Sequence, residues 1–280
     1  VNEAEPIVDA RLPDGSRVNL VLPPVALNGP IITIRKFPKE GITMKRLIAW
    51  GSISKEAAEF LEKLVKAKYN MFISGGTGSG KTTFLNALSQ FIPEDERIIT
   101  IEDNAELKLQ SLPNLVRLEA RNANMEGEGE IDIRELIRTA LRMRPDRVIV
   151  GEVRSAETID MLQAMNTGHD GSLSTGHGNS PKDMIGRLET MVLMGMEIPI
   201  EAVQRQIASG IDIIIHLGRM RDKTRKVLEI LEITGYEEGR IQMHTLYEFQ
   251  EKGSSHGKVR GSLVKKEELQ KKEKLLAAGY

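Results

Sequence analysis

The sequence predicts an α/β fold with a mainly parallel sheet, preceded by a small α/β N-terminal domain that is truncated. Three observations lead to this prediction. Between residues 70 and about 218, short apolar runs alternate with segments of helical periodicity, as they do in βαβ units. A glycine-rich segment joins the first of these runs to the first helical segment. Residues 1–36 carry strand-type runs and turn signals.

The first part of the chain is predicted to form three strands, at Ile7–Leu12, Arg17–Leu22 and Ile31–Arg35. The first two flank Pro13-Asp14-Gly15-Ser16, and a Pro-Asp-Gly sequence between two apolar runs is typical of a hairpin turn. We interpret this small sheet as the remainder of an N-terminal domain at 1–36, since the chain opens at a valine rather than at a methionine.

Residues 37–53 are predicted to be an interdomain linker, followed by the main domain at 54–250 and by a charged tail at 251–280 that is loose or helical. A helix is expected from Ser54, whose hydroxyl suits the N-cap position. Two strands at 225–249 are expected to form an antiparallel edge. In the alternating region, the expected strands are 70–74, 97–102, 147–151, 172–175 and 211–217, and the expected helices are 81–91, 131–143, 156–167 and 181–195.

The composition is that of an ordinary globular protein, with 40% hydrophobic and 28% charged residues. The formal net charge of −1 and the aromatic content of 4% argue against a nucleic-acid channel, so no nucleic-acid partner is expected. The absence of cysteine excludes disulfides and thiolate metal sites, and it fits a reducing compartment. No apolar run is long enough to span a bilayer, and no signal-peptide pattern is present.

Residues 75–82 match the phosphate-binding pattern G-x-x-x-x-G-K-[ST], between a predicted buried strand and a predicted helix. Glycines let backbone N–H groups turn toward phosphate oxygens, and the helix N-terminus adds its positive end. Lys81 can reach the β- and γ-phosphates, and Thr82 can ligate Mg²⁺. The sequence therefore predicts that a nucleoside triphosphate binds here. The predicted nucleotide-binding residues of this segment are Gly75, Gly76, Thr77, Gly78, Ser79, Gly80, Lys81, Thr82 and Thr83.

Carboxylates follow two further predicted strands, whose carboxyl ends meet at the ligand edge of a parallel sheet. Glu102 and Asp103 end one strand, and they either face a metal–triphosphate or form a polar strand end that leads into a turn. Glu152 follows Gly151, which stands where other phosphate-loop enzymes carry an aspartate. Glu152 is therefore a candidate base for the attacking water, with a glutamate at a helix N-terminus as the structural alternative.

A histidine follows another predicted strand. His177 stands between two glycines, and we expect it on a tight turn near the same edge of the sheet. A neutral imidazole there can donate a hydrogen bond to a γ-phosphate oxygen. The alternatives are an ordinary turn residue and the rival position His169, which also follows a glycine.

Taken in order, the phosphate loop and these three segments resemble the four nucleotide motifs of the secretion ATPase superfamily, which powers type II and type IV secretion, type IV pili and archaellar motors. That family also lacks the aspartate at the position of Gly151. Further segments are similar to the CpaF/TadA branch, which serves tight-adherence (Flp) pili. These segments are Arg11–Arg17, Thr33–Phe37, Leu141–Asp146 and Asn166–Ser172. The resemblance covers about residues 5–250.

The resemblance implies a RecA-like ATPase domain that hydrolyses ATP with Mg²⁺ and powers Tad/Flp (type IV) pilus assembly or secretion. By resemblance, Lys81 and Thr82 bind triphosphate and metal, Glu102 lies near the metal and the γ-phosphate, Glu152 is the base or water-orienting group, and His177 senses the γ-phosphate. Arginines are also implied at the nucleotide, from the N-terminal domain or from a neighbouring subunit. The candidates are Arg11, Arg17, Arg35, Arg144 and Arg154.

The partners that the resemblance implies are five further copies, in a homo-hexameric ring, and an integral inner-membrane platform protein of a pilus or secretion machine. The implied location is the cytoplasm, at the inner face of the cytoplasmic membrane. Two alternatives with the same overall fold stay open. One is a conjugative or effector-secreting type IV ATPase of the same family. The other is a RecA-like hexameric nucleic-acid motor, which shares the fold and the loop but which the near-zero net charge disfavours. A small-molecule kinase or a GTPase switch is a third option, and the absence of an Asn-Lys-x-Asp motif disfavours the GTPase.

Overall fold

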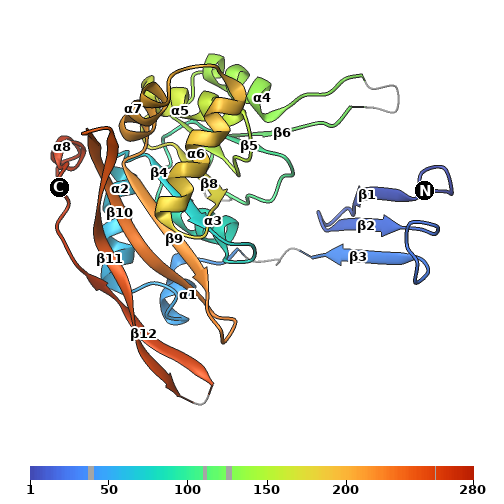
Figure 1. Ribbon diagram of the computed structural model, residues 1–280, viewed down its shortest axis with the longest axis horizontal. Coiled ribbons are helices and arrows are strands. Elements are labelled where there is room, and N and C mark those ends of the chain that lie inside the picture. Colours follow the sequence, from blue (N-terminus) through green and yellow to red (C-terminus); the bar gives the residue numbers. More distant parts are fainter. Residues whose placement is uncertain (37–40, 110–111, 124–127, 256) are drawn as a thin grey trace. The chain divides into compact units, whose positions relative to one another are not determined.

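The computed structural model describes residues 1–36, 41–109, 112–123, 128–255 and 257–280 (Figure 1). The chain forms two compact units, Val1–Gly41 and Ile42–Tyr280. The boundary between them falls in the predicted linker, of which residues 37–40 lie outside the described part. Residues 42–53 of that segment belong to the larger unit, where Met44, Leu47 and Ile53 are buried.

The smaller unit contains the antiparallel sheet that the sequence predicts, with the strand order β1-β2-β3 over residues 1–36. Its strands are β1 (Ile7–Arg11), β2 (Arg17–Val21) and β3 (Ile31–Arg35). The β1–β2 turn is set locally, because the Asp14 carboxylate accepts a hydrogen bond from the Ser16 N–H at 2.9 Å and Gly15 adopts a φ of +86°. The predicted hairpin is confirmed.

Within the described residues, the larger unit is built on a nine-stranded sheet of order β12-β11-β10-β9-β4-β8-β7-β5-β6 (Figure 1). The parallel part confirms the predicted sheet and consists of β4 (Met71–Gly75), β5 (Ile98–Glu102), β6 (Leu115–Glu119), β7 (Arg147–Val150), β8 (Leu173–His177) and β9 (Ile213–Arg219). Beyond β9 the sheet continues with the antiparallel strands β10 (Arg225–Glu237), β11 (Arg240–Ser255) and β12 (Lys258–Lys265).

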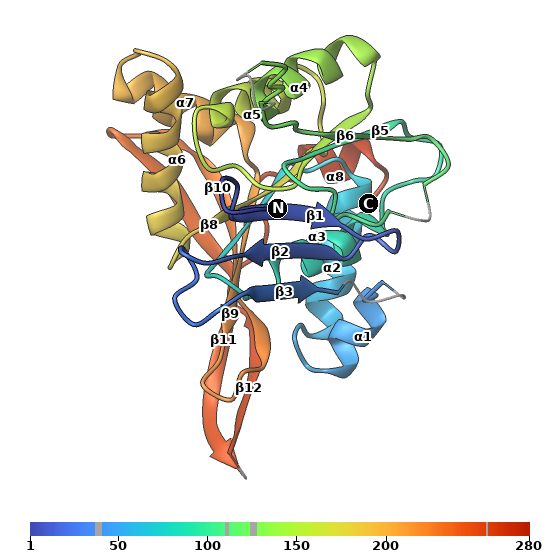
Figure 2. The ribbon, with the colours of Figure 1, turned by 90° about the vertical axis from the view of Figure 1, so that its right-hand side faces the viewer.

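Helices cover both faces of this sheet (Figure 2). One hydrophobic core contains residues of α1 (Met44–Ala49), α2 (Lys55–Lys66) and α3 (Lys81–Ser89), and the other contains residues of α4 (Ile133–Ala140), α5 (Glu157–Asn166), α6 (Pro181–Gly195) and α7 (Ile200–Gly210). Strand β4 contributes Met71 and Ile73 to the first core and Phe72 to the second. Because both faces are buried, the strand reads as a continuous apolar run.

Helix α2 begins as the sequence predicts. The Ser54 hydroxyl accepts a hydrogen bond from the Ala57 N–H at 3.2 Å, which satisfies one of the free amides of the first turn. None of the helices in the described residues has both the length and the apolar character needed to cross a bilayer.

The prediction of a loose or helical tail at 251–280 needs correction. Most of the segment pairs with the sheet, since β11 reaches Ser255 and β12 follows it as the edge strand. Leu263 and Leu269 are buried, and the buried Glu232 carboxylate accepts hydrogen bonds from the backbone amides of Gln270 and Lys271 at 2.8 and 2.7 Å. Only the short α8 (Glu273–Ala277) agrees with the helical prediction within the described part. The apolar anchors are too widely spaced among charged residues to predict this packing.

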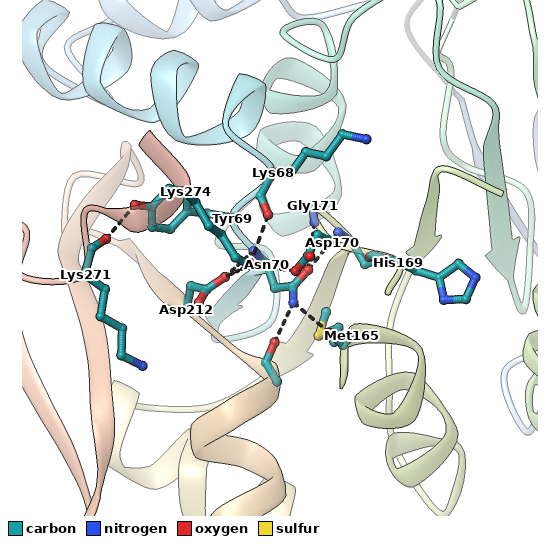
Figure 3. A network of polar contacts seen from close by, with 12 residues as sticks. Lys68, Tyr69, Asn70, Met165, His169, Asp170, Gly171, Asp212, Lys271 and Lys274 are labelled. Carbon is teal, nitrogen blue, oxygen red and sulfur yellow. Dashed lines mark hydrogen bonds and ion pairs between the residues drawn. The ribbon is translucent and has the colours of Figure 1, made fainter. Parts of the chain in front are cut away.

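A polar network joins the end of the chain to the amino-terminal ends of β4, β8 and β9 (Figure 3). The Lys274 ammonium of α8 donates to Asp170 at 2.7 Å, to Asp212 at 2.8 Å and to the carbonyl of Lys68 at 3.2 Å. The Tyr69 hydroxyl donates to the carbonyl of Lys271 at 2.6 Å. The C-terminal segment therefore closes the edge of the parallel sheet that lies opposite the phosphate loop.

The side chain of Asn70 is the centre of this network (Figure 3). Its amide nitrogen donates to the carbonyls of Met165 and Gly210 at 3.1 and 2.9 Å, and its oxygen accepts from the amides of Gly171 and Ser172 at 2.9 and 3.1 Å. One buried amide side chain thus satisfies four backbone groups where α5, α7 and β8 meet β4. Residues of the predicted family-like segment Asn166–Ser172 have this structural role.

A buried ion pair lies at the same end of the sheet, and Lys68 also approaches its carboxylate, at 3.7 Å. The Arg147 guanidinium, at the start of β7, donates from both Nε and Nη2 to the Glu96 carboxylate, with 2.9 Å for the Nη2 bond. Its Nη1 donates to the carbonyls of Val65 and Gly171 at 2.8 and 3.3 Å. The charge is therefore compensated by a bidentate partner and by two backbone acceptors.

Candidate nucleotide-binding site

The predicted phosphate loop connects β4 to α3, as its pattern requires. Gly78 and Gly80 adopt φ values of +71° and +97°, a region that L side chains rarely enter. Gly75 packs closely, because a Cβ atom there would lie 2.5 Å from the carbonyl oxygen of Leu217 on β9. Lys81 folds back over the loop, and its Nζ donates to the carbonyls of Gly75 and Gly76 at 3.1 and 3.3 Å. Its side chain is thus held at the mouth of the loop.

The loop residues fit a bound polyphosphate with Mg²⁺. Gly80 is the N-cap of α3 and supplies no side-chain cap, so the amides of the first helical turn point toward the loop. The hydroxyl oxygen of Ser79 is buried and has no hydrogen-bond partner in the described residues. Thr82 stands in the first turn of α3. In the described part of the chain, no group of three His, Asp or Glu residues is arranged to hold a metal, and Mg²⁺ in such enzymes is held mainly by phosphates.

Glu102 ends β5 in a buried position. One carboxylate oxygen accepts hydrogen bonds from the backbone amides of Glu106 and Leu107, both at 2.9 Å. Burial nonetheless raises the pKa of Glu102 to about 7, because desolvation outweighs the effect of the two amides. A raised pKa of this kind, caused by burial at a strand end, is often found for carboxyl groups at functional sites.

Gly151 is required by the position of Glu102. A Cβ atom at residue 151 would lie 2.9 Å from Cγ and 3.4 Å from Oε1 of Glu102. The backbone of Gly151 is itself fixed, since its amide donates to the carbonyl of Ile101 at 2.8 Å and its carbonyl accepts from the Thr175 hydroxyl at 2.7 Å. An aspartate cannot occupy position 151 while Glu102 keeps this conformation.

Replacing Gly151 by alanine is therefore expected to displace the Glu102 carboxylate. If Glu102 acts on the bound triphosphate, kcat for ATP hydrolysis falls by about 10²-fold, which is the effect of moving a reacting group by about 1 Å. Gly186→Ala in α6 is the matched control, because a Cβ atom at Gly186 meets nothing within 4 Å. Steady-state kinetics of both variants check this, and equal kcat values in the two would contradict it.

Glu152 follows β7 and lies between a cation and a histidine. Its Oε2 accepts hydrogen bonds from Nη2 and Nε of Arg154 at 2.6 and 2.9 Å, and its Oε1 contacts Nδ1 of His177. Arg154 also approaches Asp103 at 3.5 Å. Burial lowers the pKa of the Lys81 ammonium, and the charge of Glu152 acts on it in the opposite direction. The structure thus brings Glu152, Arg154 and His177 together beside the phosphate loop.

His177 is the last residue of β8 rather than a residue of a tight turn, so that expectation is wrong. It pairs in register with Gly75 of β4. The glycines around it serve packing. A Cβ atom at Gly176 would lie 2.8 Å from the ring of Phe72, and one at Gly178 would lie 3.1 Å from Met184. The rival His169 lies at the other end of β8, in the polar network of Figure 3.

The N-terminal arginine candidates share one row of the smaller sheet. Arg11 pairs with Arg17 across β1 and β2, and Arg17 pairs with Arg35 across β2 and β3. Opposed residues of antiparallel strands project from the same face, and that face is polar further along, where the Asn19 amide donates to Asp9 at 3.0 Å. Opposed like charges destabilise a sheet by up to about 1 kcal/mol per pair.

Arg144 lies at the opposite edge of the parallel sheet from the phosphate loop. It is exposed and precedes β7, with a φ of +53°, whereas Gly151 and Glu152 follow the carboxyl end of that strand. The structure therefore does not bring Arg144 to the loop of its own chain. The expectation that Arg144 contacts nucleotide bound to a neighbouring subunit stays a prediction.

Sequence patterns do not identify Arg225, which lies against the phosphate loop. Its Nε donates to the carbonyl of Gly78 at 3.1 Å, across 147 positions of sequence. Arg225 begins β10 in a basic stretch, and nothing in its local sequence distinguishes it from the other cations there. The contact arises from the antiparallel return of the chain after β9, next to β4.

Comparison with known proteins gives one consistent result. The family model described as Type II/IV secretion system protein matches residues 1–271. Rv3659c, a Mycobacterium tuberculosis protein named after conjugal transfer, is 40% identical over 253 residues, which is 88% of this chain and 71% of the relative. Conjugal transfer protein TrbB of Rhizobium radiobacter is 32% identical over 245 residues, 86% of this chain and 72% of the relative.

A solved structure shares the fold. The crystal structure of the VirB11 ATPase from the Brucella suis type IV secretion system, in complex with sulphate, matches with a TM-score of 0.56 and 30% sequence identity. The match covers 82% of this chain and 77% of that one.

Proposed function

Because the chain belongs to the Type II/IV secretion system protein family, we propose that it hydrolyses Mg·ATP and uses the hydrolysis to drive macromolecular transport. The observation that carries the proposal is the arrangement at the carboxyl edge of the parallel sheet. There Lys81 caps a glycine-rich loop at a helix N-terminus, and Glu152 lies beside it, fixed by Arg154 and His177. A loop for phosphates next to an oriented carboxylate is what hydrolysis of a phosphoanhydride requires.

Each residue has a distinct role in this proposal. The backbone of residues 75–80 and the ammonium of Lys81 bind the phosphates, and Thr82 holds the metal together with Glu102. Bound Mg²⁺ supplies charge neutralisation between the β- and γ-phosphates. Glu152 orients the attacking water and accepts its proton, while two hydrogen bonds from Arg154 fix the position of the carboxylate. His177 donates to the γ-phosphate and reports its presence to β8.

Arginines complete the site in the proposal. The candidates from the N-terminal unit are Arg11, Arg17 and Arg35, which lie in one row of its sheet. In phosphate-loop enzymes, one arginine supplied to the transition state changes kcat by about 10³–10⁵-fold. A row held on a separate compact unit allows hydrolysis to depend on how that unit is placed. Release of the γ-phosphate then loosens the contacts made to it by Glu102 and His177, and in such enzymes loss of ligand contacts drives conformational change.

The proposed assembly is a homo-hexameric ring at the inner face of the cytoplasmic membrane, working on an integral inner-membrane platform protein. The names of the relatives, TrbB and VirB11, favour conjugal transfer or type IV secretion as the process that is driven. The motif similarity of the sequence to the CpaF/TadA branch supports Tad/Flp pilus assembly as the second candidate.

The test is phosphate release from ATP by the protein with Mg²⁺. With ATP labelled at the γ-phosphate, the label should appear as free phosphate, whereas a kinase would transfer it. Single-stranded DNA should leave the rate unchanged, and a several-fold stimulation would favour a nucleic-acid motor instead. Sedimentation with a non-hydrolysable analogue should give a hexamer. Absence of phosphate release together with absence of ATP binding would end the proposal.

A further inference from the structure

The turn between β9 and β10 brings an unusual density of charge to the phosphate loop. The segment Arg219–Arg225 contains four cations and one anion. Strand β9 runs parallel to β4, with Leu217 in register with Gly75, so this turn leaves the sheet at the same edge as the loop. Arg219 and Arg225 lie directly opposite each other across the β9–β10 pair. Such an opposed pair of like charges is unfavourable in itself.

Other charges of the turn have partners that fix its conformation. The Asp222 carboxylate accepts hydrogen bonds from the amide and the hydroxyl of Thr224 at 2.9 and 2.6 Å and from the amide of Val259 on β12 at 2.8 Å. These bonds lower the pKa of Asp222 to about 2. Arg221 forms a bidentate ion pair with Glu251 of β11, at 2.8 and 2.5 Å. These hydrogen bonds and this ion pair therefore fix the conformation of the turn.

Arg225 lies against the phosphate loop. Its Nε–H donates to the carbonyl of Gly78 at 3.1 Å, and its Cδ lies 3.8 Å from the position of a Cβ atom on Gly80. Within the described residues, the bond from Nε to the Gly78 carbonyl is the one hydrogen bond of the Arg225 guanidinium. Its Nη1 and Nη2 groups are therefore available to a ligand. A guanidinium presents donors in a planar fork that matches phosphate oxygens.

We infer that Arg225 is a nucleotide-binding residue, which holds the Gly78 carbonyl with Nε and donates to the polyphosphate with the remaining N–H groups. The inference rests on the proposed function. It adds a phosphate-binding side chain to that site, and this side chain comes from the turn between β9 and β10. The Nε bond fixes the orientation of the peptide that follows Gly78. The charge of Arg225, reinforced by Arg219, raises the positive potential at the loop. A bound polyanion in turn screens the repulsion between the two arginines.

The experiment compares Arg225→Gln with the matched variant Lys223→Gln, which removes one positive charge from the same turn. Affinity for ATP and for inorganic tripolyphosphate is measured by calorimetry, with Mg²⁺ present. Arg225→Gln should weaken both by about tenfold or more, as loss of a charge-assisted contact does, and Lys223→Gln should change either by less than about twofold. Without ligand, both should melt within about 2 °C of the wild type, since both positions are exposed.

Arg225→Lys separates ligand contact from support of the loop. A lysine keeps the charge but cannot reproduce the Nε bond, so it should recover part of the tripolyphosphate affinity that the glutamine variant loses. Equal losses in the lysine and glutamine variants would reduce Arg225 to a support of the loop and overturn the ligand contact. Equal affinities in Arg225→Gln and Lys223→Gln would overturn the inference altogether.

Failure of the proposed function gives a different result. Lys81→Ala should lose ATP binding whatever Arg225 does, because Lys81 caps the loop. If the wild-type protein binds neither ATP nor tripolyphosphate, the proposed function is wrong. If the wild-type protein binds both ligands, Lys81→Ala loses this binding and Arg225→Gln keeps it, then only the inferred role of Arg225 is wrong.

Discussion

Glu152→Gln is expected to abolish steady-state ATP hydrolysis while ATP still binds. The amide keeps the shape of the carboxylate and can still accept a hydrogen bond from Arg154, so the local structure should persist. It cannot accept a proton from the attacking water. Loss of a general base lowers kcat by about 10²–10⁴-fold. The dissociation constant for ATP should change by only a few-fold, because the phosphate loop and Lys81 are untouched.

Phosphate release and equilibrium binding of ATP measure the two effects separately. Glu135→Gln is the matched control, since Glu135 is an exposed glutamate in the first turn of α4. It should leave both quantities unchanged. Turnover near the wild-type value in Glu152→Gln would refute its role as the base and would leave Glu102 as the candidate.

Arg147→Ala is expected to destabilise the protein by about 3–5 kcal/mol, the typical effect of removing one partner from a buried ion pair. The side chain of Arg147 is fully buried, and its loss leaves the Glu96 carboxylate without its bidentate partner. The carbonyls of Val65 and Gly171 lose a donor as well. A domain with a stability of about 5–15 kcal/mol would lose a large part of it.

Chemical denaturation measures this effect in ligand-free protein. Arg144→Ala is the control, because it removes an exposed arginine three positions earlier and should change the stability by less than about 0.5 kcal/mol. The double variant Arg147→Met/Glu96→Met leaves no buried charge unpaired. It should therefore lose less free energy of unfolding than either single variant, Arg147→Met or Glu96→Met. A double variant at least as unstable as the sum of the single ones would contradict the buried pair as the cause.

Local signals predicted much of this fold. The hairpin at the N-terminus depends on Pro13–Ser16 and the phosphate loop on its glycines, and both are short-range features of backbone conformation. The alternation of strands and helices reports burial on both faces of a parallel sheet. The strands β6 and β12 were not predicted, because their hydrophobic patterns in the sequence are weak. Edge strand β6 is only partly buried, and β12 buries Val259 and Leu263 among charged residues.

The site was less predictable because it depends on contacts between distant residues. Glu102 and Glu152 could be identified as strand ends, but the reason for Gly151 appears only when β5 pairs with β7. Arg225 has no local signature, because its approach to Gly78 follows from the order of β9 and β10 in the sheet. The glycines around His177 mimic a turn signal, although their cause is close packing against Phe72 and Met184.

The crowding between residue 151 and Glu102 also bears on ancestry. A lineage with this arrangement cannot adopt the aspartate of other phosphate-loop enzymes by one codon change, because two carboxylates would then compete for the volume of one. Shortening Glu102 to aspartate first would keep an acid there but would draw its carboxyl group back by one methylene. Either single change disturbs the other residue, so positions 102 and 151 are expected to vary together.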